Sequence, residues 1–62
     1  MDNSLAHLRK ERHWSQEDLA RQLGVSRQTI ISIEKGQFNP SLPLAFQLAE
    51  AFGLTIEDIF KP

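Results

Sequence analysis

The sequence contains no cysteine, so it can form neither disulfide bonds nor thiolate metal sites. It also lacks any long apolar run, which argues against a membrane span or a secretion signal and makes the cytoplasm the expected location. The two histidines, His7 and His13, are six residues apart on one predicted helix and should therefore point to different faces. We interpret both as surface residues and expect no metal.

The chain is short and carries almost no net charge. A chain of 62 residues buries only about 60% of the surface of its unfolded form, so its core is small. We expect a single domain over residues 1–62, stabilised by well-capped helices or by self-association. The net charge of −1 argues weakly against a nucleic-acid partner. Residues 1–36, however, hold six of the seven cations against five acids, which mildly favours a DNA-facing front.

Residues that start and stop helices divide the chain into five segments. Four hydroxyl residues are placed to cap helix N-termini: Ser15, Ser26, Ser41 and Thr55. Asp18 and Asp58 follow two of these caps by three positions and complete capping boxes. Three glycines stand where helices would end: Gly24, Gly36 and Gly53. This pattern predicts helices over residues 3–13, 16–23, 27–35, 42–52 and 56–61, and no segment alternates long enough to predict a strand.

Apolar residues at helical spacing define the expected core of this all-α chain. Trp14 could be taken for a base-stacking residue, but it is placed to pack on Leu19 at the start of a helix, which favours the core. The full predicted core is Leu5, Leu8, Trp14, Leu19, Ala20, Leu23, Ile30, Ile33, Leu44, Leu48, Ala49, Phe52, Leu54, Ile59 and Phe60.

The second and third predicted helices are joined by only Gly24-Val25-Ser26, so they must cross steeply. Ala20 is small where the two helices approach each other, and Gly24 can adopt the positive φ of a tight turn. Ile30 then buries the inner face of the third helix. Together these features predict a helix-turn-helix.

The opposite face of the third helix carries the functional signal. At 100° per residue, the side facing away from the core holds Arg27, Gln28, Ile31, Ser32 and Lys35. Arginine, glutamine and serine match the donors and acceptors of base edges in the major groove. The alternative is an ordinary polar surface.

Five segments at the expected spacing resemble one family: SQEDLA, GVSRQTI, IEKG, NPSL and AFGL. They are similar to the Cro and phage-repressor type of helix-turn-helix domain, the XRE family of bacterial regulators. The resemblance extends from LRKER near the start of the chain to the last predicted helix. It implies a compact, five-helix, lambda-repressor-like fold that binds DNA.

The resemblance also implies roles for individual residues. The positions that usually reach bases correspond to Arg27, Gln28 and Ser32. Gln16, which opens the second predicted helix, is expected to contact a phosphate and to support the start of the third. Arg9 is expected to pair with Glu34, although Arg9 could reach a phosphate as well.

The loop after the third helix, Lys35 to Asn39, usually touches the DNA backbone in this family. Two positions depart from the family pattern. Ile31 stands where a polar residue is more common, which suggests contact with a thymine methyl group. Gln37 stands where a cation is frequent, which puts one phosphate contact in doubt.

These observations predict a sequence-specific, double-stranded DNA-binding transcriptional regulator, expected to be a repressor at the nucleoid. Arg27 suits guanine, Gln28 suits adenine, and Ile31 and Ser32 complete the base-contacting set. Phosphate contacts are expected from the helix N–H groups that open at Gln16 and from a set of side chains: Gln16, Ser26, Lys35, Gln37 and Asn39.

One recognition helix reads few bases, so we expect a homodimer on a palindromic operator. Leu42, Phe46 and Ile56 form the expected dimer surface, and the alternative is that these residues merely lean on the core.

A second function class is a protein-interaction module, such as an antitoxin-like or adaptor domain, because the same fold can serve that role. An enzyme is not expected, because no nucleophile–base–orienter set is present. We expect no cofactor, no membrane partner and no small-molecule ligand.

Overall fold

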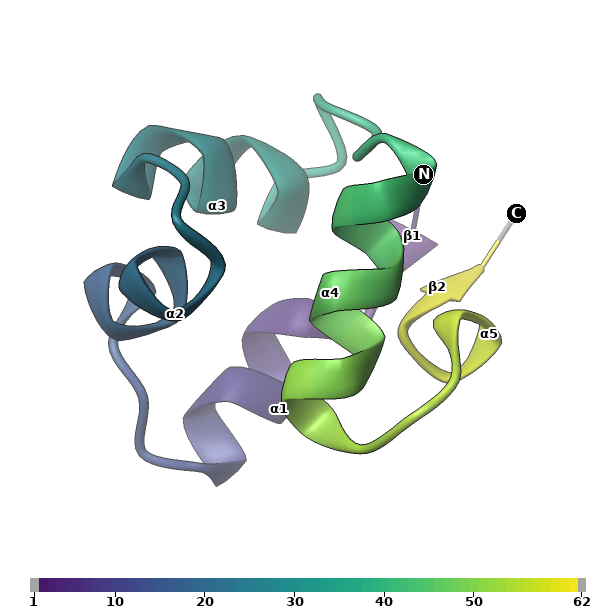
Figure 1. The fold of residues 1–62 in the computed structure, drawn as a ribbon, viewed down its shortest axis with the longest axis horizontal. Coiled ribbons are helices and arrows are strands. Elements are labelled where there is room, and N and C mark those ends of the chain that lie inside the picture. Colours follow the sequence, from purple (N-terminus) through teal and green to yellow (C-terminus); the bar gives the residue numbers. More distant parts are fainter. Residues whose placement is uncertain (1, 62) are drawn as a thin grey trace.

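Five helices and one short strand pair make up the computed structural model, which describes residues 2–61. In chain order the elements are β1 (Asp2–Asn3), α1 (Leu5–Glu11), α2 (Gln16–Leu23), α3 (Arg27–Glu34), α4 (Leu42–Phe52), α5 (Ile56–Ile59) and β2 (Phe60–Lys61). Figure 1 shows α2 and α3 on one side of α4, and α5 with the two strands on the other. The predicted all-α class and the five helices are confirmed.

The two strands were not predicted, and they shorten two of the expected helices. β1 and β2 pair antiparallel, with Asp2 opposite Lys61 and Asn3 opposite Phe60. The expected helix over residues 56–61 is therefore wrong at its end. Phe60 is extended, with φ −110° and ψ 136°, and the proline that follows Lys61 in the sequence disfavours a helical Lys61.

The first helix is also shorter than the expected residues 3–13. It begins at Leu5, whose N–H donates to Asn3 Oδ1 at 3.1 Å. It ends at Glu11, and His13 then adopts a left-handed φ of 59°. The two histidines thus do not share one helix as expected, although both are exposed.

The predicted capping residues begin the helices as the sequence indicates. Ser15 Oγ accepts from Asp18 N at 2.9 Å, while Asp18 Oδ2 accepts from Ser15 N at 2.8 Å. Thr55 and Asp58 make the same reciprocal pair at the start of α5. These bonds satisfy backbone N–H groups that have no partner inside the helix.

The core lies where the five helices meet. Every predicted core residue is buried or packs against the buried cluster, and Trp14 lies with its ring centroid 5.2 Å from that of Phe52. The prediction missed Ala45, which is 6% exposed on α4. The buried cluster consists of Leu5, Leu19, Ala20, Ile30, Ile33, Ala45, Leu48, Ala49, Phe52, Ile59 and Phe60.

Candidate nucleic-acid interface

A tight turn joins α2 to α3. Gly24 adopts φ +70°, and the N–H of Val25 donates to Ala20 O at 3.0 Å. Ala20 is 3% exposed and Ile30 is fully buried, so small and apolar groups fill the contact between the two helices. In Figure 1, α3 runs across the view while α2 is seen nearly end-on, so the helices cross steeply.

A buried ion pair holds the last residue of α3. Arg9 Nε lies 2.7 Å from Glu34 Oε2, and Arg9 Nη2 lies 3.3 Å from Oε1. The two side chains are only 10% and 8% exposed. Arg9 Nη1 donates to Trp14 O at 2.8 Å. All three nitrogens of this guanidinium have protein acceptors, which favours the structural role of Arg9 over its alternative role as a phosphate contact.

Gln16 joins the same cluster, which corrects the expected role of this residue in supporting α3. Its Nε2 donates to Glu34 Oε1 at 3.0 Å, so it supports the end of α3 rather than the start. The reason is the steep crossing, which brings the first residue of α2 beside the last residue of α3. Arg9 and Gln16 therefore fix where the C-terminal end of α3 lies relative to α1 and α2.

Asn3 makes a second connection to the end of α3. Its Nδ2 donates to Ile33 O at 2.8 Å. Because Asn3 belongs to β1, this bond ties α3 to the paired ends of the chain. Sequence reasoning missed this contact, since nothing around Asn3 in the sequence indicates a partner 30 positions away.

The outward face of α3 is open to solvent and positively charged. Arg27, Gln28 and Lys35 are exposed, and Ile31 and Ser32 are half-buried beside them. Glu34 is the only acid within α3, and Arg9 neutralises it. Among residues 2–61, no ion pair involves Arg27 or Lys35. The charges available on this face are therefore cationic, even though the chain as a whole is not.

The start of α3 is already hydrogen-bonded. Ser26 Oγ accepts from Thr29 N at 3.2 Å and lies 2.9 Å from Thr29 Oγ1. A phosphate contact by the Ser26 hydroxyl would share that oxygen with the cap.

The N-terminus of α2 attracts an anion less strongly than its helix dipole alone would suggest. Ser15 accepts the N–H of Asp18, and the carboxylates of Glu17 and Asp18 lie in the first turn. The pKa of Asp18 lies below its ordinary value of 3.8, chiefly because Ser15 donates its backbone N–H to that carboxylate. The charge thus stays negative at neutral pH and weakens the attraction of this helix end for a phosphate, so a contact here depends on the Gln16 side chain.

The loop after α3 folds back onto the last turn of that helix. The N–H groups of Gln37 and Phe38 donate to Ser32 O at 3.0 and 3.3 Å. Gln37, Phe38 and Asn39 are exposed, so the loop presents these side chains beside the outward face of α3.

The three residues of the expected dimer surface do not behave alike. Leu42 is 64% exposed and Phe46 is 57% exposed, one turn apart on α4. Ile56 instead packs against the core, as the alternative interpretation has it, so it does not belong to an exposed apolar surface with the other two. It follows the cap Thr55 at the first position of α5, and that short helix packs on α4.

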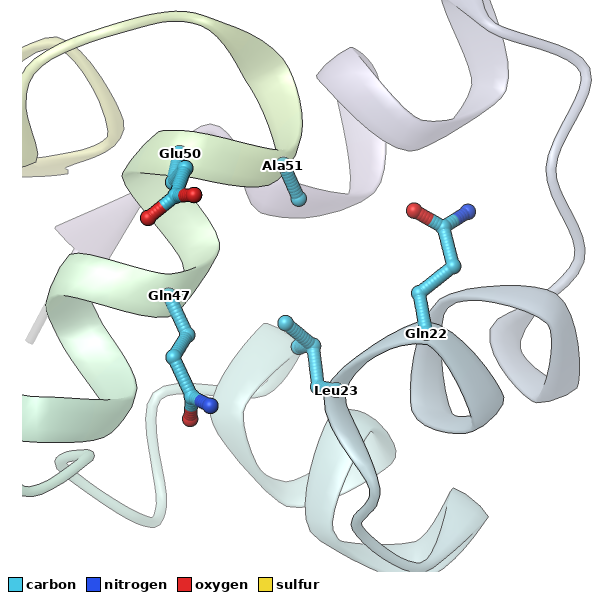
Figure 2. Close-up of a pocket in the computed structure, with 5 residues that line it drawn as sticks. All are labelled: Gln22, Leu23, Gln47, Glu50 and Ala51. Atoms are coloured by element: carbon cyan, nitrogen blue, oxygen red, sulfur yellow. The ribbon is translucent and has the colours of Figure 1, made fainter.

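A shallow pocket lies between α2 and α4, away from the outward face of α3. Figure 2 shows Leu23 pointing toward the space between the helices, with Gln22 and Gln47 on either side. Glu50 and Ala51 complete the lining. This lining contains an acid and no cation, so it does not suit a phosphate.

Two further features of residues 2–61 bear on function. No group of three or more histidine, aspartate or glutamate side chains is arranged to hold a metal ion in this part of the chain. None of the helices described here combines the length and apolar character needed to cross a membrane.

Comparison with known proteins identifies close relatives of the chain. The family model for the helix-turn-helix matches residues 5–59. An uncharacterised helix-turn-helix-type transcriptional regulator of Methanocaldococcus jannaschii is 60% identical over 60 residues, covering 97% of this chain and 91% of the relative. The cryptic phage CTXphi transcriptional repressor of Vibrio cholerae is 33% identical over 57 residues, covering 92% of this chain and 51% of that protein.

A solved structure shares the fold. The restriction-modification controller protein of Aeromonas hydrophila matches with a TM-score of 0.81 and 36% identity, over 90% of this chain and 85% of that protein.

Proposed function

Because the chain belongs to the phage-repressor-type, or XRE, family of helix-turn-helix transcriptional regulators, we propose that it reads a specific DNA sequence through α3. The helix enters the major groove with its outward face toward the base edges. Residues 1–62 act as one DNA-binding domain, which works at the nucleoid in the cytoplasm and catalyses no reaction.

The observation that carries this proposal is the charge and chemistry of the outward face of α3. Arg27 and Lys35 are exposed and form no ion pair with an acid among residues 2–61, and the one acid of α3 is bound by Arg9. Gln28 is exposed on the same face. A solvated helix face is usually richer in paired acids and lysines.

Specificity comes from side chains that match base edges. Arg27 binds the O6 and N7 acceptors of guanine, and Gln28 binds the N6 and N7 atoms of adenine. Ile31 and Ser32 lie half-buried beside them and contact the bases between. Each good bidentate contact contributes about 1–3 kcal/mol of discrimination.

Affinity comes from the phosphates on either side of the groove. Lys35 supplies the charge, and the exposed loop side chains Gln37 and Asn39 approach the backbone. Gln16 is hydrogen-bonded to Glu34, and Ser26 is hydrogen-bonded to Thr29. Both side chains contact phosphates through the hydrogen-bonding groups that these bonds do not use. With so few cations, binding should weaken only modestly with salt for each protomer.

Two copies of the chain bind a palindromic operator as a homodimer. The exposed apolar pair Leu42 and Phe46 forms the contact between them. The protein acts as a repressor by occupying DNA. The name of the phage relative, a transcriptional repressor, is in keeping with this role.

Selection from random duplex DNA tests the proposal. The wild-type protein should enrich a palindromic sequence, and changing Arg27, Gln28 and Lys35 together to alanine should abolish enrichment. The matched control replaces Lys10, Gln47 and Lys61 by alanine. These residues are also exposed, and the three changes remove the same charge from other parts of the surface.

Circular dichroism should show that both variants remain helical. Retained enrichment by the variant of α3 would contradict the proposal. If neither the wild-type nor the control protein enriched any sequence, the chain would instead be a protein-interaction module.

A further inference from the structure

A small hollow lies on one flank of the outward face of α3. It is lined by Ser26, Gln28, Thr29, Ser32 and Phe38. Four of these residues belong to α3 or to its cap, and the fifth comes from the loop that follows. Phe38 is 47% exposed, which is unusual for so large an apolar side chain in a region that is otherwise polar.

The backbone places Phe38 at this hollow. Ser32 O accepts from the N–H groups of both Gln37 and Phe38, and Gly36 takes the positive φ of 75° that turns the chain back. The aromatic ring is therefore held beside α3 by hydrogen bonds of the loop and not by burial in the core.

The lining of the hollow is less polar than its residue names suggest. The hydroxyls of Ser26 and Thr29 bond to each other at 2.9 Å, so much of their hydrogen-bonding capacity is used internally. Gln28 and Ser32 supply the remaining polar groups, and no charged side chain lines the hollow. An apolar surface thus adjoins an amide.

This combination matches one feature of the major groove. Thymine presents a C5-methyl group beside the O4 acceptor, and cytosine does so beside a donor when it is methylated. Arg27 and Lys35 do not line the hollow. Cationic recognition and apolar recognition are therefore separated across the face of α3.

We propose that the hollow is a subsite for the C5-methyl group of a pyrimidine in the major groove. The ring of Phe38 receives the methyl group, and the second N–H of the Gln28 amide, which the contact with adenine does not use, faces the adjoining polar edge of the base. The subsite rests on the proposed function, since it requires α3 to face the bases. It adds the loop residue Phe38 to the base-contacting residues, a role that the sequence did not indicate.

Replacing thymine by deoxyuridine tests the subsite, because the change removes only the methyl group. In the selected operator, replacing each thymine in turn should weaken binding about fourfold at one position of each half-site. The Phe38→Ala variant should bind the two operators within a factor of about two. Gln47→Ala is the control, since Gln47 is exposed, does not line the hollow and has no part in the proposed DNA or dimer contacts.

A second control addresses Ile31, which could contact the methyl group from the other flank. If the sensitivity to deoxyuridine is lost in Ile31→Ala and kept in Phe38→Ala, the proposed subsite is wrong. It is also wrong if no thymine in the operator is sensitive while the operator is still selected. Failure to select any operator would instead contradict the proposed function.

Cytosine methylation separates the two sources of the methyl group. With cytosine at the sensitive position, C5-methylation should strengthen wild-type binding if the methyl group alone is recognised. If methylation brings no gain, the subsite belongs to thymine, whose O4 the amide of Gln28 then reads.

Discussion

The guanidinium of Arg9 binds both carboxylate oxygens of Glu34 and the carbonyl of Trp14, and the Arg9 side chain is only 10% exposed. In a buried ion pair of this kind, replacing one partner destabilises the protein more than replacing both. Removing one partner strands a desolvated charge, whereas replacing both by apolar groups does not.

Glu34→Ala should therefore lower the free energy of unfolding by about 3 kcal/mol or more. The double variant Arg9→Met with Glu34→Ala should be more stable than Glu34→Ala alone, because the stranded charge is gone. Urea unfolding of the two variants measures the difference. A double variant that is no more stable than Glu34→Ala would contradict the explanation by a stranded charge.

A different side chain, Arg27, affects recognition without affecting the fold. It is exposed and lies outside the buried cluster, so Arg27→Ala should leave stability nearly unchanged. We expect discrimination at one base pair of each half-site to fall by about 1–3 kcal/mol. Competition with single-base variants of the operator measures this effect. Equal weakening on every sequence would reassign Arg27 to a phosphate.

Residue pairs differ in how well the sequence could predict them. The Arg9–Glu34 pair follows from the family resemblance. The bond from Asn3 to Ile33 does not, because it depends on where both ends of the chain lie in the folded molecule. Phe38 could have been noticed as the apolar residue in a polar loop, but its place beside Ser32 depends on the turn at Gly36.

At the scale of elements, the connection between α2 and α3 depends on the backbone of one residue. Gly24 has φ +70°, and a Cβ built there would meet nothing within 4 Å. Gly24→Ala should therefore cost only the left-handed backbone penalty, about 1–2 kcal/mol. Thermal unfolding measures the cost.

Gly53→Ala is a matched control for this prediction, because Gly53 has φ +68° and equally open surroundings at the end of α4. The two variants should lose similar stability. A much larger loss at Gly24 would indicate that the crossing of α2 and α3 itself is distorted.

Two helix starts make stability depend on pH. Hydrogen bonds from Ser15 and Thr55 lower the pKa of Asp18 and Asp58 below 3.8. The folded state therefore stabilises the charged form of these carboxylates more than the unfolded state does. Their stabilisation is complete above the unfolded pKa and is lost as the pH falls through the lower folded values.

Urea midpoints measured between about pH 6 and about pH 2 should thus fall more steeply for the wild type than for the Asp18→Asn, Asp58→Asn variant. Glu17→Gln removes an acid of the same turn that accepts no capping bond among the described residues. It should keep the wild-type slope, and a flattened slope in this control would show that the caps are not the cause.

Helix positions were predicted better in the middle of the chain than at its ends. The starts of α2, α3, α4 and α5 follow from local hydroxyl and acid patterns, which need no knowledge of tertiary structure. The strand pair could not be predicted, because two residues at each end carry no period. Their pairing depends on the helices that bring Asp2 opposite Lys61.

For the whole molecule, the exposed pair Leu42 and Phe46 predicts how two copies share an operator. Phe46→Glu should leave the monomer folded, since Phe46 is 57% exposed, but should abolish cooperative occupation of a palindrome. Analytical ultracentrifugation on operator DNA measures this. Gln47→Glu places the same charge on the next residue of α4 and should bind as the wild type does.

The spacing of half-sites gives an independent check on the dimer. Centres about 34–36 Å apart lie on one side of the duplex, and inserting about five base pairs turns one half-site to the other side. The insertion should reduce wild-type affinity to that of a single half-site. Unchanged affinity would contradict the dimer.

The pairing of β1 with β2 sets an order for folding. It joins positions separated by nearly the whole chain, so the entropy of loop closure is greatest for this contact. The local turns between helices close short loops and can form first. The pair of β1 and β2 should therefore form late in folding and open early in unfolding. The bond from Asn3 to Ile33 O should form and break with it. Hydrogen exchange should show the ends opening before the core, and the last turn of α3 loosening with them.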